Sequence, residues 1–502
     1  MSNIIILAAI ILYLGMVVWI GVICSKKNSD VGDFYLGGRK LGPVVTAMSA
    51  EASDMSSYLL MGVPGLAYLT GLADATWTAI GLALGTYLNW LIVAKRLRTY
   101  SDVCSAITIP DFFANRYRDP KMLTLISAAL IVIFFIPYTA SGFAACGKLF
   151  NSLLGFDYHA AMIVSAVVIV LYCTMGGFLA ASTSDLVQSI IMTFALAVVV
   201  IFGIVQAGGM GAVLDNAKAL PGYLDMFHTH IAETNTSGDY GFFKIVSTLA
   251  WGLGYFGMPH ILVRFMSIEK PSMIKKSSIV AIVWVIISLF SAVLIAYLGR
   301  MVMGAELLTQ GNQKLVFIAM ARRFFPAGIC GLLLAAIIAA SISTADSQLL
   351  VASSSFTADL YKPFFRKNAS EKETLMVGRI LVLILSLIAF GIANSKGSGA
   401  QAIMDMVENA WGAFGASFGP TILLSLFWKR FNYQGAVAGV ISGFVVDLGW
   451  LLTGMTDATG IFEVVPGFFA SLLIAVIVAK LTAEPNKKAV EIFDQGIKAE
   501  TE

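Results

Sequence analysis

The sequence carries few charged side chains. Lysine, arginine, aspartate and glutamate make up 13% of its 502 residues, about half of the roughly 25% that is usual in soluble globular proteins. Hydrophobic residues make up 58%. So little charge cannot cover the surface of a water-soluble protein of this length, and we therefore expect an all-α polytopic membrane protein.

Neither sign of charge is in excess. The formal net charge is only +3 at pH 7, which excludes a strongly basic nucleic-acid-binding surface and a long acidic tail. We therefore predict no nucleic-acid partner. The expected partners are the lipid bilayer and small molecules.

The residues of disulfide frameworks, metal sites and enzyme active sites are also scarce. The five cysteines include no CxxC pair, so neither a disulfide framework nor a zinc site is indicated. The four histidines, His159, His228, His230 and His260, form no membrane metal motif and no nucleophile–base arrangement. We predict a protein that is not an enzyme and that has no cofactor.

Apolar segments long enough to cross a bilayer run along almost the whole chain. A hydrocarbon core of ~30 Å needs about 20 apolar residues per helix. We predict a single integral-membrane domain over residues 1–482, followed by a short cytoplasmic tail, 483–502. About thirteen spans are expected, at residues 3–23, 44–69, 73–94, 122–148, 158–181, 183–207, 242–263, 277–300, 327–357, 376–394, 400–428, 433–453 and 461–480.

The distribution of basic residues predicts which side each loop faces. An odd number of spans puts the two termini on opposite sides of the membrane. With the N-terminus outside, 25 of the 33 lysines and arginines fall in cytoplasmic segments, as the positive-inside rule requires. This places the C-terminus in the cytoplasm and Arg264 in a cytoplasmic loop, and it leaves no basic residue at the depth of Glu51 and Asp54.

The second span, 44–69, is predicted to be a broken helix. Its centre holds two carboxylates, Glu51 and Asp54, together with four serines that are poor helix formers. An unwound membrane helix exposes carbonyls and half-helix dipoles, which bind a small cation and the carboxylate of an organic solute. The alternative is a continuous helix whose serines bond to the preceding turn.

The seventh span, 242–263, repeats this irregularity with different residues. Three glycines and Pro259 fall within eight residues, a composition that is hard to keep in a regular helix. The two broken spans each begin a group of five, so we predict inverted repeats at about 44–207 and 242–428 with a site at the midplane. Trp251, Tyr255 and Tyr138 would offer ring faces to a solute; the alternative is close helix packing.

The ninth span, 327–357, gathers oxygen-bearing side chains. Ser343, Thr344, Asp346 and Ser347 lie within about one helical turn. A hard cation such as Na⁺ binds several oxygens, whereas the alternative is hydroxyls bonded to carbonyls of their own helix. Asp185, near the cytoplasmic end of the sixth span, is a further ionisable group that can also be a helix-end cap.

Several of these segments resemble the sodium/solute symporter family, most closely its sodium/proline symporter branch. The similarity covers nearly the whole chain. The similar stretches are Asp33–Pro43, Ala52–Ser56, Leu60–Gly65, Gly176–Ala180, Gly252–Gly257, Pro259–Ile261, Ser343–Leu350 and Ala413–Pro420.

The resemblance implies roles for particular residues. The implied Na⁺ ligands are the carbonyls of Ala52, Met55 and Ala340 and the hydroxyls of Ser343 and Thr344. The implied solute pocket consists of Ser56, Ser57, Tyr58, Tyr138, Trp251, Tyr255, Met258 and Pro259. Asp54 matches an essential carboxylate of the family and Arg39 a cytoplasmic-loop arginine; Asp185, Asp346 and Glu51 are further candidates for coupling or gating.

Three positions depart from the branch. Ser57-Tyr58 stands where Gly-Trp is usual, Met258 where glutamine is usual, and Glu51 where a small or amide residue is usual. The resemblance implies a Na⁺-coupled importer of L-proline that works by alternating access in the cell membrane; the sequence leaves its oligomeric state open, with a monomer as our expectation. The alternatives are Na⁺- or H⁺-coupled symport of another small amino acid or carboxylate and, from another class, a channel or membrane sensor.

Overall fold

The computed structural model describes residues 2–118, 121–396 and 400–501, and within them the chain is almost entirely helical. The exception is a β-hairpin of β1 (His228–Ile231) and antiparallel β2 (Thr236–Asp239). The longer helices are α1 (Ser2–Ser25), α3 (Pro43–Met55), α5 (Leu72–Leu88), α8 (Met122–Leu154), α9 (Tyr158–Gln206), α13 (Ile274–Met303), α15 (Ala327–Ser354), α16 (Glu371–Lys396), α17 (Ala400–Phe427), α18 (Tyr433–Leu452), α20 (Val464–Leu481) and α21 (Lys487–Thr501).

Short helices occupy the two ends of the molecule and the interrupted spans. They are α2 (Val31–Leu36), α4 (Val63–Thr70), α6 (Lys95–Val103), α7 (Ile109–Tyr117), α10 (Met210–Lys218), α11 (Phe242–Leu249), α12 (Pro259–Ser267), α14 (Val316–Phe324) and α19 (Met455–Thr459). Tighter 3₁₀ segments span Gly37–Arg39, Ala250–Phe256, Pro271–Met273 and Glu306–Leu315, and wider π segments span Tyr58–Gly62, Asn89–Ala94 and Ser355–Phe365.

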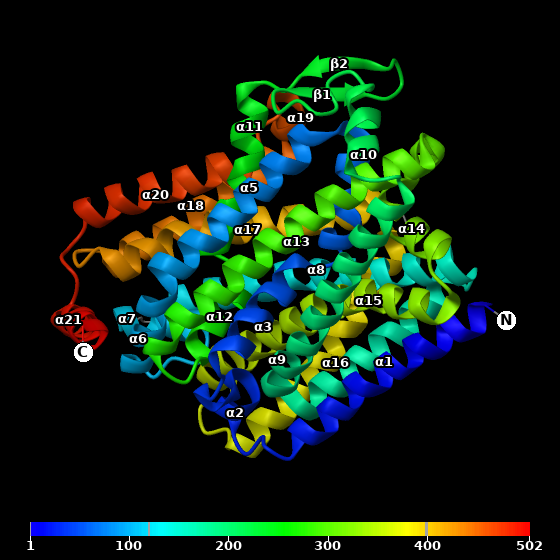
Figure 1. The fold of residues 1–502 in the computed structure, drawn as a ribbon. Helices are drawn as coiled ribbons and strands as arrows, with labels where there is room; N and C mark the ends of the chain where they lie inside the picture. The colour runs from blue at the N-terminus through cyan, green and yellow to red at the C-terminus, as the bar shows by residue number, and fades with distance from the viewer. Residues whose placement is uncertain (1, 119–120, 397–399, 502) are drawn as a thin grey trace.

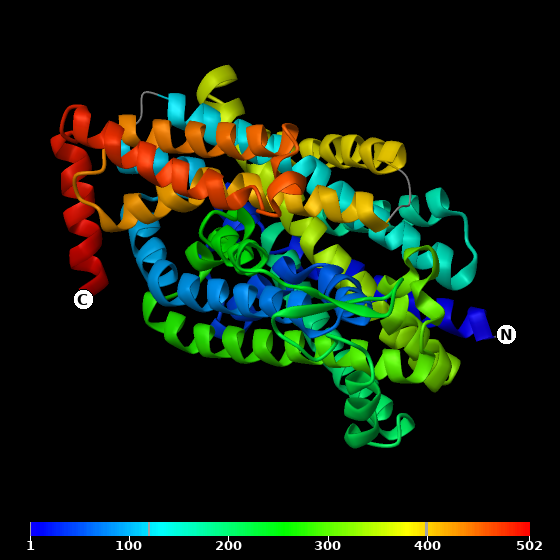
Figure 2. The same ribbon diagram turned by 90° about the horizontal axis from the view of Figure 1, so that it is seen from above.

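The helices pack into one body around a polar centre. Helix α15 contacts α1, α8 and α9, and α3 contacts α9, α13 and α15. Helices α17, α18 and α20 pack on one another along one side, with α13 on the opposite side (Figure 2). The residues of α15 from Leu333 to Ser354 are all buried, so this helix is the axis of the structure.

Helix α9 joins two of the predicted spans, 158–181 and 183–207. Its 49 residues contain one non-helical residue, Gly177, at φ 56° and ψ −150°. Contacts with α1 show the direction of the chain on either side of this point. Before Gly177, the partners on α1 advance from Ile10, beside Ala161, to Gly21, against Tyr172. After Gly177 they return, since Gln188 donates to the Tyr13 hydroxyl at 2.9 Å. The chain thus runs along α1 and then back, so Gly177 makes a sharp reversal between two membrane segments.

Ten helices of the described residues are long and apolar enough to cross a membrane. They differ from the thirteen predicted spans at three places: 44–69 and 242–263 are each divided into shorter helices, and two spans are merged in α9. The fold class is confirmed as an all-α polytopic membrane protein with broken second and seventh spans. The exact count of thirteen stays a prediction.

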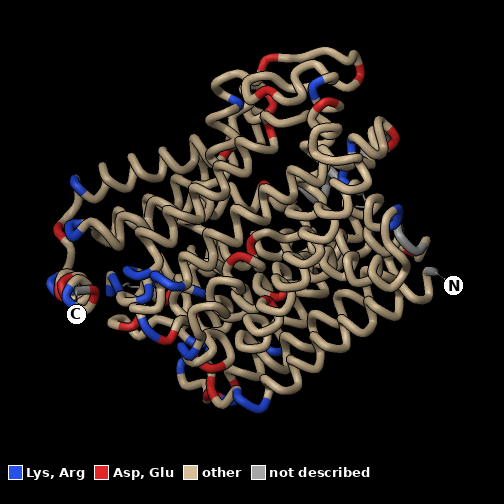
Figure 3. The backbone as a smooth tube through the Cα atoms, viewed as in Figure 1, with Lys and Arg blue, Asp and Glu red and all other residues tan. Residues whose placement is uncertain are grey.

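The termini lie at opposite ends of the molecule (Figure 1), and most of the basic residues gather on the side that carries the C-terminus and α2 (Figure 3). Both features fit an outside N-terminus, which stays a prediction.

The predicted tail, 483–502, contains a helix that packs onto the body. Helix α21 lies against α6. The Tyr100 hydroxyl donates to the carbonyl of Phe493 at 2.9 Å, and the buried Arg116 donates to that of Ala489 at 2.9 Å. The tail therefore ties the loops at this end together.

Deleting residues 487–502 should lower the thermal midpoint of the purified protein. The deletion removes the helix that covers Tyr100, so it exposes this side chain, and it leaves Arg116 without one of its acceptors. We expect a fall of about 5 °C, since a loss of about 2 kcal/mol shifts the midpoint of a large protein by roughly 2–4 °C per kcal/mol. Asp494→Asn, which removes only an exposed ion pair with Lys429, is the control; an equal effect of both variants contradicts the docking role.

Candidate functional site

The first break follows α3. Helix α3 ends at Met55, and Ser56 has φ 46° and ψ −166°, values rarely adopted by residues other than glycine. The Ser56 hydroxyl accepts a hydrogen bond from the amide of Tyr58 at 3.2 Å. The π segment and α4 then continue toward the other end of the molecule. The predicted break is confirmed, and the alternative of a continuous helix is wrong.

The second break lies between α11 and α12. After the 3₁₀ segment, Met258 is extended at φ −72° and ψ 107°, and Pro259 starts α12. A Cβ on Gly254 would lie 2.0 Å from the Trp411 indole nitrogen, and one on Gly257 would lie 2.1 Å from a carbonyl of α17. These glycines allow the unwound segment to contact α17 closely, so here the break and close packing occur together.

Oxygens from the first break meet α15. The Ser343 hydroxyl donates to the carbonyl of Ala52 at 2.8 Å and lies 3.1 Å from the carbonyl of Ala340. The Thr344 hydroxyl donates to the same Ala340 carbonyl at 3.2 Å. Four of the five predicted Na⁺ ligands therefore lie together in the buried interior. The fifth, Met55, is the buried last residue of α3.

The two breaks are linked through Asp54. The Tyr255 hydroxyl donates to the Asp54 carboxylate, and both residues are buried. The backbone carbonyl of Tyr255 accepts from the Asn89 side chain at 2.9 Å. The carboxylate of one broken helix is thus joined to the unwound part of the other.

An aromatic cluster covers this junction. The Trp251 ring stacks on Tyr58 at 5.7 Å between centroids and 11° between planes, and on Phe462 at 5.2 Å and 27°. The Trp411 indole donates to the Trp251 carbonyl at 2.8 Å. Trp411 and Phe462 were not predicted from the sequence, because they come from α17 and the segment before α20.

The remaining predicted pocket residues flank α12. Tyr138 and Met258 are buried, and Tyr138 meets the ring of His260, the residue after Pro259, edge-on at 6.4 Å. Neither ring nitrogen of His260 has a hydrogen-bond partner among the described residues. His260 is a candidate solute contact that the sequence reasoning did not assign. Ser57 lies within the first break, between Ser56 and Tyr58.

A second carboxylate, Glu51, lies one helical turn before Asp54 and is bonded to Trp90 rather than to the second break. One of its carboxylate oxygens accepts from the Trp90 indole at 2.9 Å, and the other has no partner among the described residues. It lies three residues before Asp54 on buried α3. The structure therefore places Glu51 next to Asp54 and bonded to Trp90, and its coupling or gating role stays a prediction.

Arg264 corrects the prediction that no basic residue lies at the depth of these carboxylates. The Arg264 and Asp185 side chains are both 0% exposed and form an ion pair at 3.3 Å. The Ser49 hydroxyl donates to the same Asp185 oxygen at 2.6 Å and accepts from the guanidinium at 3.1 Å. Placing Arg264 in a cytoplasmic loop was wrong, because packing carries this end of α12 into the bundle. The alternative of a helix-end cap for Asp185 is also wrong, because this residue is buried inside α9, eight residues after Gly177.

The network continues to α15. Arg264 also donates to the Ser347 hydroxyl, which lies 2.9 Å from an oxygen of Asp346. Asp346 accepts from the Tyr172 hydroxyl as well. One guanidinium therefore connects α3, α9, α12 and α15 next to the candidate cation ligands.

Arg264→Gln should strongly destabilise the protein, because it leaves Asp185 buried without its cation. Removing one partner of a buried ion pair costs about 3–5 kcal/mol, and we expect the thermal midpoint to fall by roughly 10 °C. The double variant Arg264→Gln/Asp185→Asn should recover much of this loss. Lys270→Gln, an exposed change after the same helix, is the control, and a similar small effect of both single variants contradicts the structural role of the pair.

Arg39 lies apart from the site. It has φ 54° and donates to the carbonyls of Ser101, Ala106 and Met266 at 2.9, 2.7 and 2.8 Å. Burial lowers the pKa of its guanidinium to about 10, which leaves it charged at neutral pH. Arg39 joins α6 to α12 at the α2 end, and its coupling role stays a prediction.

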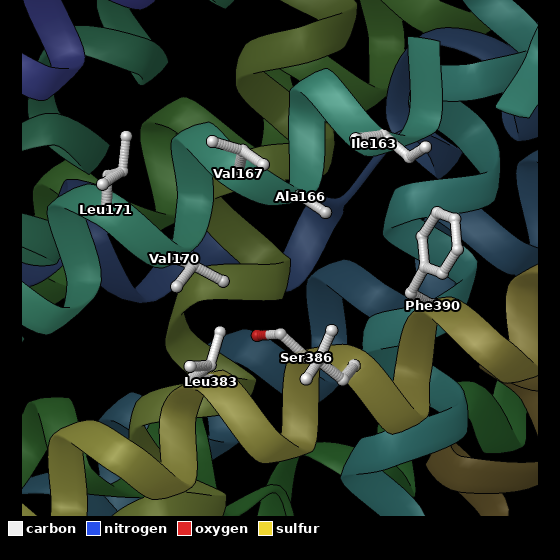
Figure 4. Close-up of a pocket in the computed structure, with 9 residues that line it drawn as sticks. Ile163, Ala166, Val167, Val170, Leu171, Leu383, Ser386 and Phe390 are labelled. Carbon is white, nitrogen blue, oxygen red and sulfur yellow. The ribbon is translucent and has the colours of Figure 1, made fainter. Parts of the chain in front are cut away.

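A separate pocket of about 360 Å³ lies between α9 and α16 (Figure 4). Apart from Ser386, its lining residues are apolar, and the Ser386 hydroxyl is bonded to a carbonyl of its own helix at 2.7 Å. Ile163, Val167 and Leu171 are exposed on the outer surface here. Such a pocket offers no group that can orient a charged solute.

The sequence is similar to those of known membrane transporters over nearly its whole length. Residues 34–443 match the model of the sodium:solute symporter family. The chain is 44% identical to the high-affinity proline transporter PutP of Bacillus subtilis (strain 168), covering 95% of this chain and 98% of that one. It is 42% identical to the osmoregulated proline transporter OpuE of the same organism (94% of each chain) and 40% identical to a sodium/proline symporter of Staphylococcus aureus (92% and 90%).

Solved structures show the same fold. A Na⁺-coupled sialic acid symporter, in a substrate-bound outward-open state, matches with a TM-score of 0.79 at 19% identity, covering 96% of this chain and 99% of that one. Mhp1, a nucleobase-cation-symport-1 family transporter, matches with a TM-score of 0.53 at 13% identity, covering 92% and 98%. With a family match over residues 34–443 and relatives that are 40–44% identical over most of its length, the chain belongs to the sodium:solute symporter family.

Proposed function

We propose that this protein is a secondary active symporter that uses a Na⁺ gradient to import L-proline by alternating access. The observation that carries the proposal is the contact between the Ser343 hydroxyl and the Ala52 carbonyl, which joins the broken end of α3 to α15 through oxygens alone. The relatives named as proline transporters and sodium/proline symporters support the choice of solute and ion.

The proposed Na⁺ ligands are the carbonyls of Ala52, Met55 and Ala340 with the hydroxyls of Ser343 and Thr344. The two hydroxyls donate to carbonyls of this set. A Na⁺ ion would bind among these oxygens, with the hydroxyl hydrogens turned away so that the oxygen lone pairs face the ion, since hard cations prefer oxygen ligands. Its binding would fix the end of α3 against α15.

The proposed solute pocket lies between the two breaks, beneath the aromatic cluster. Backbone amides freed after Met55, at Ser56 and Ser57, would bind the carboxylate of proline, as half-helix N-termini bind anions. Trp251 and Tyr58 would cover the pyrrolidine ring, with Tyr138, Tyr255, Met258 and Pro259 as the other walls.

Coupling then follows from shared structure. Na⁺ at the end of α3 would order the break that also holds the solute carboxylate, and the bond from Tyr255 to Asp54 would carry this order to the second break. Each ligand must tighten the binding of the other by the same factor. Asp54 is the proposed coupling carboxylate, with Asp185 and Asp346 holding the neighbouring helices through Arg264.

A second candidate is symport of another small amino acid or carboxylate, or coupling to H⁺. Tyr58 and Met258 change the pocket wall relative to the branch, and the unpartnered oxygen of buried Glu51 can carry a proton. A channel or sensor is the candidate from another class, but two broken helices favour a gated, occluded site. We propose that the protein acts as a monomer in the cell membrane, with its N-terminus outside.

A ligand screen by thermal shift tests the solute and the ion together. Purified protein is heated with proline, other small amino acids or small carboxylates, in NaCl, LiCl or choline chloride at two pH values. We expect the largest rise in midpoint with proline and only when Na⁺ is present. A larger rise with another solute, or a rise that follows pH rather than Na⁺, would favour the second candidate.

A further inference from the structure

Two acidic side chains lie buried together outside the proposed solute site. Asp447 is on α18 and Glu463 directly precedes α20, and each residue is 2% exposed. They lie toward the end of the molecule that carries α19 and the β-hairpin (Figure 1). Helices α17, α18 and α20 approach closely there, since a Cβ on Gly443 would lie 2.2 Å from a carbonyl of α17.

Oxygens of the two carboxylates converge on the missing side chain of Gly412 in α17. A Cβ at Gly412 would lie 2.9 Å from an Asp447 oxygen and 3.6 Å from a Glu463 oxygen. The absence of a side chain at this position therefore lets carboxylate oxygens from the α18 and α20 segments approach the same point on α17.

Neither carboxylate is neutralised by the described residues. The Asp447 oxygen that faces Gly412 has no hydrogen-bond partner. Glu463 accepts from the Thr456 hydroxyl at 2.9 Å through its other oxygen. No ion pair with a described lysine, arginine or histidine involves either residue. Two such groups in a low-dielectric interior are stable only if they hold protons or a bound cation.

We propose that Asp447 and Glu463 bind a small hard cation, Na⁺ or Ca²⁺, at the Gly412 face of α17. The donors are carboxylate oxygens from two helices, with the Thr456 hydroxyl beside Glu463, and these are the donors that hard cations prefer. Glu408, one helical turn before Gly412, adds charge of the same sign. This site is separate from the proposed Na⁺ ligands on α3 and α15.

The cation would hold three helices behind the aromatic cluster. Gly412 follows Trp411, whose indole donates to the Trp251 carbonyl, and Glu463 follows Phe462, which stacks on Trp251. A bound cation therefore fixes α18 and α20 against α17. These contacts lie next to the aromatic rings that pack over the two broken helices. Its effect is to stabilise this cover.

Equilibrium binding of ²²Na⁺ and of ⁴⁵Ca²⁺ to the full-length protein in phosphatidylcholine nanodiscs tests the proposal. We expect Asp447→Asn to lose one bound ion per chain in one of the two isotope arms, which identifies the cation. Gly412→Ala, which puts a methyl group into the space, should lose the same ion. Asp457→Asn, an exposed change on neighbouring α19, should keep it.

Ser343→Ala separates this site from the proposed coupling site, because it should leave the ion that depends on Asp447 in place. If Asp447→Asn does not give a monodisperse protein, Glu463→Gln and Gly412→Ala supply the same comparison. Equal numbers of both ions bound by the parent protein and by the folded variants at Asp447, Glu463 and Gly412 would overturn the proposal, because the two carboxyl groups would then hold no metal cation.

Discussion

Replacing Ser343 by alanine should raise the Na⁺ concentration for half-maximal proline uptake by about 10–100-fold. The Ser343 hydroxyl is the side chain that joins α15 to the Ala52 carbonyl. Losing one oxygen partner of a charged group costs about 1.5–3 kcal/mol, and each 1.4 kcal/mol is roughly tenfold in affinity. Because the solute pocket is unchanged, the maximal rate at saturating Na⁺ should fall much less.

Ser341→Ala is the matched control for this change. Ser341 is a buried serine of the same helix, and its hydroxyl donates to the carbonyl of Ile337 at 3.0 Å, one turn back. It should change the Na⁺ dependence by less than about threefold, since it removes only a neutral hydrogen bond. If the two variants shift the Na⁺ dependence equally, Ser343 is not an ion ligand.

Thr344→Ala should behave like Ser343→Ala, and Trp251→Ala should instead weaken proline binding at saturating Na⁺.

Asp54→Asn should lower the initial rate of Na⁺-driven proline uptake by at least about 100-fold. The amide keeps the shape of the side chain and can still accept from Tyr255, but it removes the negative charge next to the proposed ion. Loss of one partner of a buried charge pair costs roughly 2–5 kcal/mol. Initial uptake rates in proteoliposomes, at matched protein content, measure the effect.

Glu51→Gln tests whether Na⁺-driven uptake needs the negative charge of Asp54 in particular or that of either carboxylate on α3. Glu51 is bonded to Trp90 and lies beside the site, so its amide variant should keep most of the Na⁺-driven uptake. Tyr255→Phe, which removes only the donor to Asp54, should lose less than Asp54→Asn. If Glu51→Gln is inactive while Asp54→Asn transports, the coupling carboxylate is Glu51 and the proposed coupling scheme is wrong.

Both broken helices could be predicted from local sequence, because their causes are local. Serines near Asp54 compete for backbone hydrogen bonds, and Ser56 adopts positive φ where the helix ends. The second break depends on glycines such as Gly254, which permit contact with Trp411. Composition at these two places therefore predicted the elements that position the site.

The partners across the bundle could not be predicted in this way. Arg264 follows an apolar run near a helix end, where hydropathy assigns a loop, yet tertiary packing buries it against Asp185. Trp411 and Phe462 reach Trp251 only because α17 and the start of α20 lie beside the second break. Arg264 falls four residues after His260, so on a helix the two lie on one face, and this spacing is the one signal in the sequence that points to its depth.

The span boundaries show the same limit. The two spans predicted at 158–181 and 183–207 appear as one element reversed at Gly177. Hydropathy places the division at Ser182, where the polar run Ser-Thr-Ser-Asp begins, but the chain reverses five residues earlier, at Gly177. The direction of the chain became clear only from the contacts with α1.

The central claim is that an inward Na⁺ gradient drives proline uptake through this protein. The most direct measurement is the uptake of radiolabelled proline into proteoliposomes under three conditions of equal ionic strength. These are an inward Na⁺ gradient, an inward H⁺ gradient without Na⁺, and no ion gradient. We predict accumulation above the external concentration with the Na⁺ gradient, its collapse when a Na⁺ ionophore is added, and none with the H⁺ gradient alone. Uptake that does not respond to Na⁺ under a functioning gradient would contradict the account.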